Sequence, residues 1–304
     1  SKSTGTIGGV LDTNLSGPRR LTAGAARDFL LGFDAVSGRG ERFKSGGRVM
    51  KNVTGYDLSK LICGSYGTLA VVDEVTIKTM PRPETSLSLV FGCDDMKSAV
   101  AQIAAIFASP HEPGAAAILP QNVAAIAGLD MAASMIVVIR LEGIALSIKD
   151  RAAHLRYMGK CDKGGFLGTL PQAASEVLWI KICNVDLLAH ANGDIWKLSC
   201  PPASAPAIVA AIEPSFETAF YADWAGGLLW VAGPSGTEFG TALRAALMCH
   251  GGGHAQLVCD RAMSKNSVPV FQPLPPAQAS LTKRVKAAFD PLSVLNFGRM
   301  HNGI

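Results

Sequence analysis

The sequence has no CxxC pair, although it contains seven cysteines. They stand singly along the chain, at Cys63, Cys93, Cys161, Cys183, Cys200, Cys249 and Cys259. Iron–sulfur clusters, structural zinc sites and disulfide frameworks all need grouped or paired cysteines. The pattern therefore predicts reduced, mostly buried thiols in a cytoplasmic protein.

Long apolar runs are also absent. A membrane-spanning helix needs about 18 to 20 consecutive apolar residues, whereas the longest candidates, MIVVI at 135–139 and LLWVAG at 228–233, have the length of strands. The chain starts with neither an initiator Met nor a signal peptide. We therefore expect a soluble protein that reaches a membrane only through a partner.

Charge of one sign is not concentrated anywhere. The 28 basic and 24 acidic residues leave a net charge of +4, and no basic block occurs. A nucleic-acid-binding face would need clustered Lys and Arg. With 304 residues and 48% hydrophobic composition, the chain is instead expected to be globular, and its length favours two domains over one.

Several nucleotide and nucleophile motifs are missing. No glycine-rich loop ends in Lys followed by Ser or Thr, and Gly38 and Gly40 are followed by Phe43 where a G-x-G-x-x-G pattern needs its third glycine. GSYG at 64–67 has Cys63 where the G-x-S-x-G elbow needs glycine, so Ser65 is interpreted as a turn residue.

Paired metal ligands and paired carboxylates are equally scarce. His250 and His254 flank three glycines, which do not favour the helix that an i,i+4 zinc pair requires. Asp73 and Glu74 are consecutive in a predicted strand, so their side chains are expected on opposite faces, which makes a poor acid/base pair.

Residues 1–83 are rich in glycine and β-forming residues. FLLGFDAVS at 29–37 and RFKS at 42–45 predict a hairpin with Gly38 and Gly40 in its turn. Asp57 is the expected N-cap of a short helix, LSKLIC, that ends at Gly64. A long strand from Thr68 then ends near Pro81 and Pro83, the predicted domain boundary.

Strands alternate with helices in residues 84–278. Strands are predicted at 86–92, AAAILP and SMIVVIRLEG, with helices at 96–107 and 144–158. After a polar link, GKCDKGG at 159–165, the remaining order is strand, helix, strand, strand, helix, strand. This βαββαβ order is that of the ferredoxin-like unit, and the first half has a similar rhythm. A final helix at 279–290 precedes an extended tail.

Glycine-rich segments are what the sequence does have. Five lie in the first 70 residues: TIGG (6–9), SGP (16–18), GAARD (24–28), VTGYD (53–57) and GSYGTLA (64–70). Each alone is typical of a tight turn. Together they favour a cofactor, because glycines let main-chain N–H groups approach an anionic or planar ligand closely.

These segments resemble a known family. TIGGVLDTNLSGPRRLTAGAARDFLLGFDAVSGRGE and KNVTGYDLSKLICGSYGTLAVVDEVTIK are similar to the second half of the FAD-binding domain of the vanillyl-alcohol-oxidase/PCMH superfamily. SGPRR, VMKNVTGYD and FDPLSVLNFGRM are most similar to FAD-binding E subunits of glycolate oxidase. The resemblance is dense in residues 4–83, returns at 289–300 and holds only in outline between them.

The resemblance implies an α+β fold of three parts. Residues 1–83 would be the C-terminal part of the PCMH-type FAD-binding domain, 84–278 an α+β cap or substrate domain with ferredoxin-like units, and 279–304 a helix and tail returning to the FAD domain. It implies cofactor-binding roles for Thr6, Ile7, Gly8, Gly9, Ser16, Gly17, Gly24, Arg27, Asp28, Gly55, Tyr56, Asp57, Gly67, Thr68 and Leu69.

The implied activity is FAD-dependent oxidation of glycolate, a 2-hydroxy acid, to glyoxylate. A cofactor is needed because no side chain accepts a hydride unaided. The implied partners are a flavoprotein D subunit and an iron–sulfur F subunit, in a cytoplasmic complex peripheral to the inner membrane. Two other interpretations stay open: a non-catalytic assembly subunit with the same fold, and another hydroxy-acid or sugar-acid oxidase of the superfamily.

Two features depart from the family pattern. The family's first FAD-binding subdomain should precede Thr6, so we expect a fragment of a longer protein, and whether this chain holds FAD alone stays open. No His or Tyr base stands in a motif position, so the catalytic base is unassigned. Four residues are candidates for binding a substrate carboxylate: Arg19, Arg20, Arg299 and His301. The alternative for each is an ordinary solvated surface residue.

Overall fold

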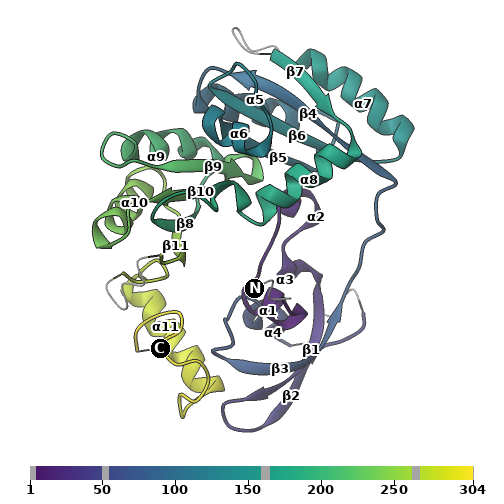
Figure 1. Cartoon of the computed structure of the whole chain (residues 1–304). Coiled ribbons are helices and arrows are strands. Elements are labelled where there is room, and N and C mark those ends of the chain that lie inside the picture. The colour runs from purple at the N-terminus through teal and green to yellow at the C-terminus, as the bar shows by residue number, and fades with distance from the viewer. Residues whose placement is uncertain (1–4, 50–54, 159–164, 262–267, 304) are drawn as a thin grey trace. The chain divides into compact units, whose positions relative to one another are not determined.

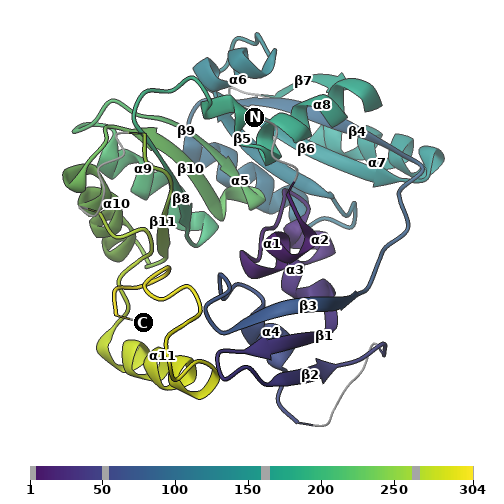
Figure 2. The same cartoon turned by 60° about the horizontal axis from the view of Figure 1, so that its bottom comes forward.

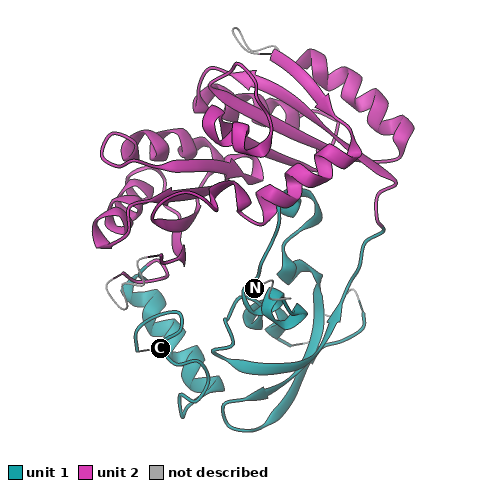
Figure 3. Ribbon diagram, in the orientation of Figure 1, with its two compact units in different colours: residues 1–81, 273–304 teal, residues 82–272 magenta. Residues whose placement is uncertain are grey.

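The computed structural model describes residues 5–49, 55–158, 165–261 and 268–303. The chain divides into two compact units, one made of residues Ser1–Pro81 and Pro273–Ile304 and the other of Arg82–Gln272 (Figures 1 and 3). The C-terminal segment therefore belongs to the same unit as the N-terminal one. Each unit is described separately below.

Unit 1 is built on a three-stranded antiparallel sheet of order β2-β1-β3 (Figure 2). The predicted hairpin is confirmed, and Gly40 adopts a φ of +77° in its turn. Asp57 caps α4 by accepting the Lys60 N–H at 3.1 Å, as predicted. The elements of the unit are α1 (Ile7–Asp12), α2 (Arg20–Ala23), α3 (Ala26–Phe29), β1 (Leu30–Ser37), β2 (Arg42–Gly46), α4 (Leu58–Ile62), β3 (Ala70–Ile77) and α11 (Pro276–Phe289).

One face of this sheet carries the core of unit 1. Phe33 and Ala35 of β1 pack with Ile62 of α4, and Val285 and Phe289 of α11 pack against the same cluster. Helices from opposite ends of the chain thus cover one face, because strand side chains alternate between the faces.

The other face of the sheet carries charged side chains. Arg42 pairs with Asp73 at 2.9 Å, and Lys44 pairs with Asp34 at 2.6 Å. The prediction that Asp73 and Glu74 point to opposite faces is wrong. Asp34 pairs with Glu74 but Ala35 pairs with Val72, so a β-bulge at Asp73 brings both carboxylates onto the charged face.

Unit 2 contains an eight-stranded sheet of order β11-β8-β10-β9-β5-β6-β4-β7, with helices on both faces (Figure 1). Its first half comprises β4 (Thr85–Cys93), α5 (Met96–Phe107), β5 (Ala115–Pro120), α6 (Gln121–Ala127), β6 (Met135–Gly143), α7 (Ala145–Met158), β7 (Gly165–Leu170) and α8 (Gln172–Cys183). Its second half comprises β8 (Asp194–Ser199), α9 (Ala205–Ile212), β9 (Ala219–Asp223), β10 (Leu228–Gly233), α10 (Thr237–Cys249) and β11 (His254–Cys259). Short 3-10 turns occur at Asp186–Leu188, Pro202–Ser204 and Trp224–Gly226.

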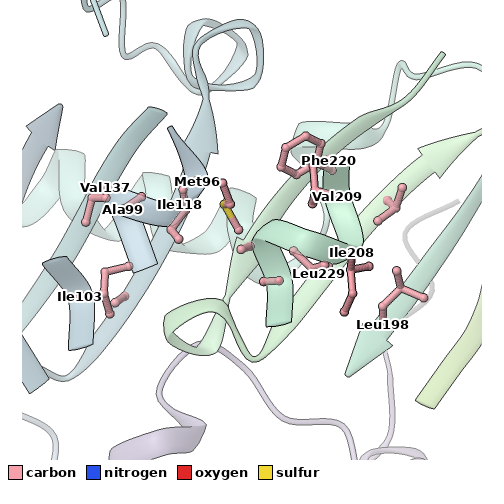
Figure 4. Close-up of a cluster of buried hydrophobic side chains, with 14 of the residues drawn as sticks. Met96, Ala99, Ile103, Ile118, Val137, Leu198, Ile208, Val209, Phe220 and Leu229 are labelled. Carbon is pink, nitrogen blue, oxygen red and sulfur yellow. The ribbon is translucent and has the colours of Figure 1, made fainter. Parts of the chain in front are cut away.

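The two halves of the sheet have the same internal order. Numbered within its own half, each set of four strands places its first and third strands in the centre, and the halves join through their second strands, β5 and β9, at the pair Ile118 and Ala222. Helices α5, α7, α9 and α10 pack on one face, and α6 and α8 pack on the other. Figure 4 shows the first of these cores, in which Met96, Ala99 and Ile103 of α5 lie near Ile118 and Val137.

Three elements of unit 2 were not predicted from the sequence: α6, β7 and α8. The predicted polar link at 159–165 lies outside the described residues except for Gly165, where β7 begins. Of the six described cysteines, Cys63 and Cys93 are buried, whereas Cys183 and Cys249 are exposed. The expectation of mostly buried thiols is therefore wrong for these last two.

Candidate functional site

The loop at 64–68 of unit 1 is a tight left-handed turn. Gly64, Tyr66 and Gly67 have φ values of +90°, +55° and +67°. The Thr68 N–H and hydroxyl both donate to the Ser65 carbonyl, at 3.0 and 2.7 Å. Glycine is favoured at such positions because it has no Cβ. The backbone conformation of the loop therefore explains the glycines at positions 64 and 67.

What approaches these two glycines is the protein itself. A Cβ at Gly64 would lie 3.3 Å from the Asn14 side chain, and one at Gly67 would lie 2.9 Å from Asn296 Nδ2. The initial inference that a ligand lies against these glycines therefore does not follow from their lack of a Cβ alone.

Two polar groups of this loop are left without partners. Ser65 is only 6% exposed, and its Oγ has no hydrogen-bond partner in the described part of the chain. Within the described residues, the Gly67 N–H also has no acceptor. Buried polar groups are normally paired, so these two groups are the ones available to a bound molecule.

Helix α1 lies against this loop. The Gly64 N–H donates to the Leu11 carbonyl at 2.9 Å, and the Tyr66 N–H donates to the Asp12 carbonyl at 2.8 Å. Burial raises the pKa of the Asp12 carboxyl. The N-terminal glycine segment and the 64–68 loop therefore form one region of unit 1.

The predicted glycine-rich loop at Thr6–Gly9 is wrong. Thr6 is the N-cap of α1, and its Oγ1 accepts the Gly9 N–H at 3.0 Å. A capping hydroxyl satisfies a free amide of the first turn and favours the helix. Among the described residues, a Cβ at Gly8 would meet only the Thr6 hydroxyl, at 3.9 Å, so no other described group closes that side of the helix. Ile7 is 54% exposed.

Two of the predicted cofactor-binding side chains have structural partners. The Ser16 hydroxyl accepts the Ala26 N–H at 3.2 Å, and the Asp28 carboxylate accepts the Ala25 N–H at 2.8 Å. That N–H, and then Lys60, lowers the pKa of Asp28 below its ordinary value against the opposing effect of burial. These side chains hold the chain between Gly17 and α3 together rather than standing free for a ligand.

Two cations lie close to the 64–68 loop. The Lys60 ammonium donates to the Arg27 carbonyl at 2.6 Å. Burial raises the pKa of Cys63, and the charges of Arg27 and Lys60 partly offset this rise. Both positive charges therefore act at the residue that precedes Gly64, against the negative charges of Asp12 and Asp28.

The Gly55–Asp57 stretch gives a mixed result. Gly55 has a φ of +77°, and Tyr56 is 92% exposed, whereas the Asp57 carboxylate is used as the cap of α4. Residues 53 and 54 of the predicted VTGYD segment lie outside the described residues. Leu69 is 7% exposed and belongs to the core of unit 1.

The sequence interpretation missed three residues near the C-terminal end: Lys286, Asp290 and Asn296. Lys286 and Asn296 bind the 64–68 loop, and Asp290 binds Lys286. Lys286 Nζ donates to the carbonyls of Thr68 and Leu295, each at 2.7 Å, and to Asp290 Oδ2 at 2.6 Å. Asn296 Nδ2 donates to the Tyr66 carbonyl at 2.9 Å. The signal available in the sequence was the i,i+4 spacing of Lys286 and Asp290 on a predicted helix.

The Lys286–Asp290 pair is buried, with residue exposures of 5% and 1%. Burial alone would raise the pKa of Asp290, but the Lys286 ammonium and the N–H groups of Leu295 and Val294 outweigh it and hold that pKa below its ordinary value. The Asp290 carboxyl is therefore ionised in the folded protein at neutral pH.

The four candidates for gripping a carboxylate all belong to unit 1. Arg19 and Arg20 stand at the start of α2, and the Arg299 N–H donates to the Asn296 carbonyl at 3.0 Å. Burial lowers the pKa of His301. Across the described parts of the chain, no group of three or more His, Cys, Asp or Glu residues could hold a metal ion, and no helix is both long and apolar enough to cross a membrane.

The mixed α+β fold resembles that of alkyldihydroxyacetonephosphate synthase. Two solved structures of alkyldihydroxyacetonephosphate synthase align with 95% of this chain at TM-scores of 0.64 and 0.67, with 14% and 15% identity. The chain spans 57% of the length of those proteins. No family model matches the sequence.

Sequence relatives define the family more narrowly. The chain is 33% identical to glycolate oxidase subunit GlcE of Escherichia coli over 298 residues, which cover 97% of this chain and 72% of that protein. The chain therefore belongs to the GlcE family of FAD-linked oxidoreductases. Over 116 residues, 38% of this chain and 25% of the relative, it is 36% identical to glycolate oxidase subunit GlcD of Bacillus subtilis. Over 118 residues, 39% of this chain and 25% of the relative, it is 32% identical to D-lactate dehydrogenase of Anaerostipes hadrus.

The residues around the 64–68 loop fit FAD as an anionic ligand in part. The Ser65 hydroxyl and the Gly67 N–H, unpaired among the described residues, are hydrogen-bond donors. The charges of Arg27 and Lys60 act on the neighbouring Cys63, and so do the opposite charges of Asp12 and Asp28. The open side of α1 at Gly8 leaves its backbone accessible. The Ser16 hydroxyl and the Asp28 carboxylate, to which the sequence resemblance assigned cofactor-binding roles, already accept backbone N–H groups within the protein.

Proposed function

We propose that the chain is part of an FAD-binding subunit of a glycolate oxidase complex, which oxidises glycolate to glyoxylate. The observation that carries this proposal is the similarity to GlcE along 97% of the chain. The unpaired donors of the 64–68 loop support it, because they lie where the sequence resemblance expects the cofactor.

In this proposal, the N-terminal residues bind and orient the cofactor. FAD, when bound, would supply the hydride acceptor for a 2-hydroxy acid. The Ser65 hydroxyl and the Gly67 N–H would donate hydrogen bonds to it, and Arg27 would favour its negative charge electrostatically. The open face of α1 at Gly8 would give the cofactor room beside the backbone.

The other residues that the resemblance assigned to cofactor binding would then have two different roles. Thr6, Ser16, Gly24, Asp28 and Asp57 would shape the site by holding α1, α3 and α4 in place. Ile7, Gly9, Gly17, Gly55, Tyr56, Thr68 and Leu69 would line or support it through their backbone. No described residue is proposed as the catalytic base.

The unit of residues 82–272 would be the substrate or cap domain. Its second half has the βαββαβ order of a ferredoxin-like unit, and its first half has the same strand order with the additional helices α6 and α8. The repeated strand order within the eight-stranded sheet supports this proposal. The segment after residue 278 would return to the FAD domain, which is consistent with the packing of α11 on the sheet of unit 1.

The partners we propose are a flavoprotein D subunit and an iron–sulfur F subunit, with electrons passing from the flavin to the iron–sulfur subunit. The similarity to subunits named GlcE and GlcD supports membership of such a complex. The complex would be cytoplasmic and peripheral to the inner membrane.

Turnover by the purified complex tests the proposal. We expect glycolate-dependent reduction of an artificial electron acceptor with the wild-type subunit, and loss of most of that activity with Gly8→Leu while the complex still assembles. Gly47→Ala is the control, because a Cβ at Gly47 meets nothing within 4 Å. Full activity of an assembled Gly8→Leu complex would instead support the interpretation as a non-catalytic assembly subunit.

A second candidate substrate is a chiral 2-hydroxy acid of the D configuration, such as D-lactate, which the similarity to D-lactate dehydrogenase favours. The two candidates differ in kcat/KM for glycolate and D-lactate, measured with the same complex. If kcat/KM is more than about tenfold higher for D-lactate, which corresponds to about 1.4 kcal/mol in transition-state binding, D-lactate replaces glycolate as the proposed substrate.

A further inference from the structure

Two hydrogen bonds described above join the C-terminal segment of unit 1 to the 64–68 loop. In both of them the loop contributes a backbone carbonyl oxygen. Asn296 binds the Tyr66 carbonyl and Lys286 binds the Thr68 carbonyl. These contacts join residues 230 and 218 positions apart. Their effect on the loop is therefore a matter of backbone orientation rather than side-chain chemistry.

A carbonyl held in place fixes the amide that follows it. The Tyr66 C=O and the Gly67 N–H belong to one planar trans peptide unit, so they point in opposite directions. With the oxygen directed to Asn296, the Gly67 N–H is directed away from the C-terminal segment. Lys286 fixes the plane of the peptide between Thr68 and Leu69 in the same way, because it binds the Thr68 carbonyl.

The fixed N–H is the one that has no acceptor among the described residues. Its neighbours are satisfied, since the Tyr66 N–H binds Asp12 and the Thr68 N–H binds Ser65. The Ser65 Oγ, 6% exposed and without a partner, is the second free group of the same loop. The C-terminal contacts thus leave a small set of donors oriented for a ligand.

Lys286 is well suited to this role because its position is itself rigid. Its ammonium uses all three of its donors, on Thr68, Leu295 and Asp290, at 2.6 to 2.7 Å. Asp290 in turn accepts the N–H groups of Val294 and Leu295, at 3.0 and 2.8 Å. This network fixes the path of the chain toward Asn296.

From these contacts we propose that Asn296 and Lys286 are positioning residues for the cofactor site: Asn296 orients the Gly67 N–H toward FAD, and Lys286 supports it by holding the Thr68 carbonyl and the chain that leads to Asn296. The proposal rests on the proposed function for the identity of the ligand. The clamp on the loop itself stands on the hydrogen bonds alone.

The first experiment measures the loop without any cofactor. Amide hydrogen exchange is followed in the purified 304-residue chain for Gly64, Tyr66 and Thr68, whose N–H groups are bonded in the structure. Asn296→Gly and Asn296→Asp both remove the side-chain N–H that donates to the Tyr66 carbonyl. Glycine and aspartate both tolerate the φ of +43° at position 296. Asn302→Gly and Asn302→Asp, at a nearby exposed position, are the matched controls.

We expect exchange at these three amides to rise about tenfold in both Asn296 variants, corresponding to about 1.4 kcal/mol of lost protection. The unfolding midpoint should stay unchanged because Asn296 is exposed. The Asn302 variants should behave like the wild type. Unchanged exchange in both Asn296 variants overturns the clamp.

The second experiment measures FAD affinity by flavin fluorescence in the same proteins. We expect Kd to rise at least tenfold in Asn296→Gly and in the double variant Lys286→Met/Asp290→Asn, which removes the buried pair without leaving one charge alone. Lys283→Met, an exposed position of the same helix, is its control.

The two experiments separate the two claims. If the wild-type chain binds FAD neither alone nor in the assembled complex, the proposed function fails while the exchange result still decides whether the clamp exists. If FAD binds and the clamp variants loosen the loop without changing Kd, the orientation of Gly67 toward FAD is overturned.

Discussion

At the residue scale, most side chains that resemble cofactor ligands serve the fold. Ser16 and Asp28 are bonded to backbone amides of α3, and Thr6 and Asp57 cap short helices. The sequence identified the right region because the same small and hydroxylic residues build tight turns and cofactor sites. It could not identify Asn296, because that contact depends on a chain approach 230 residues away.

The buried ion pair leads to a prediction about stability. Lys286→Met should lower the free energy of unfolding by about 3 kcal/mol, because it leaves the buried Asp290 carboxylate without its charge partner. Lys286→Met/Asp290→Asn should lose clearly less. Urea unfolding at neutral pH measures both, and equal losses in the two variants would contradict the account of the pair.

The same pair should make stability depend on pH in acid. The folded pKa of Asp290 is lowered, so its contribution is present above the ordinary carboxyl pKa and is lost as the pH falls through the folded value. Stability of the wild type should therefore decline below about pH 4. The decline should be shallower in Lys286→Met/Asp290→Asn, and an identical slope would count against the pair.

Asp223 has the opposite behaviour. Burial raises its pKa to about 7, against a hydrogen bond from the Trp224 N–H that lowers it. Because the unfolded chain releases this proton near pH 3.8, its contribution falls by about 1.4 kcal/mol per pH unit as the pH rises toward 7. Asp223→Asn should therefore be more stable than the wild type at pH 7 and comparable near pH 4.

Unfolding at both pH values, with the exposed Asp130→Asn as control, checks this expectation. A variant that is destabilised equally at the two pH values would show that the Asp223 carboxyl is not held protonated in the folded protein.

At the element scale, strands and long amphipathic helices were predictable and short or evenly apolar segments were not. The hairpin of β1 and β2 and the helix α5 follow from turn glycines and apolar spacing. Helix α8 buries Leu178, Trp179 and Ile182 but also exposes Val177 and Ile180, so its sequence has no clear apolar face. The bulge at Asp73 has no local sequence signal, since it is set by pairing with β1.

The turn between β1 and β2 packs directly on the C-terminal segment. The Gly38 N–H donates to the Phe289 carbonyl at 3.0 Å, and a Cβ at Gly38 would overlap the Asp290 carboxylate. Gly38→Ala should therefore cost about 1 to 3 kcal/mol through overpacking, measured by urea unfolding. Gly47→Ala should be near neutral, and equal effects of the two changes would contradict this packing.

At the scale of the whole molecule, the family assignment came from the density of motifs in the first 83 residues and near the C-terminus. The composition excluded nucleic-acid binding and disulfide scaffolds but could not identify a substrate. The middle of the chain folds into a sheet whose two halves have the same strand order, although its sequence matches the family only in outline. Core positions accept many apolar residues of similar volume, which explains why the strand pattern was predictable where motifs were not.

FAD binding to the chain tests the central claim most directly, because it requires the open face of α1 and the 64–68 loop together. Equilibrium titration with FAD is carried out on the wild type, Gly8→Leu and Gly47→Ala. Gly8→Leu should be about 0.5 to 1 kcal/mol more stable, since leucine favours a helix over glycine, so lost binding would not reflect unfolding. We predict saturable binding by the wild type and Gly47→Ala and at least tenfold weaker binding by Gly8→Leu. Equal affinity in all three proteins, or no binding by the wild type either alone or in the assembled complex, would contradict the account.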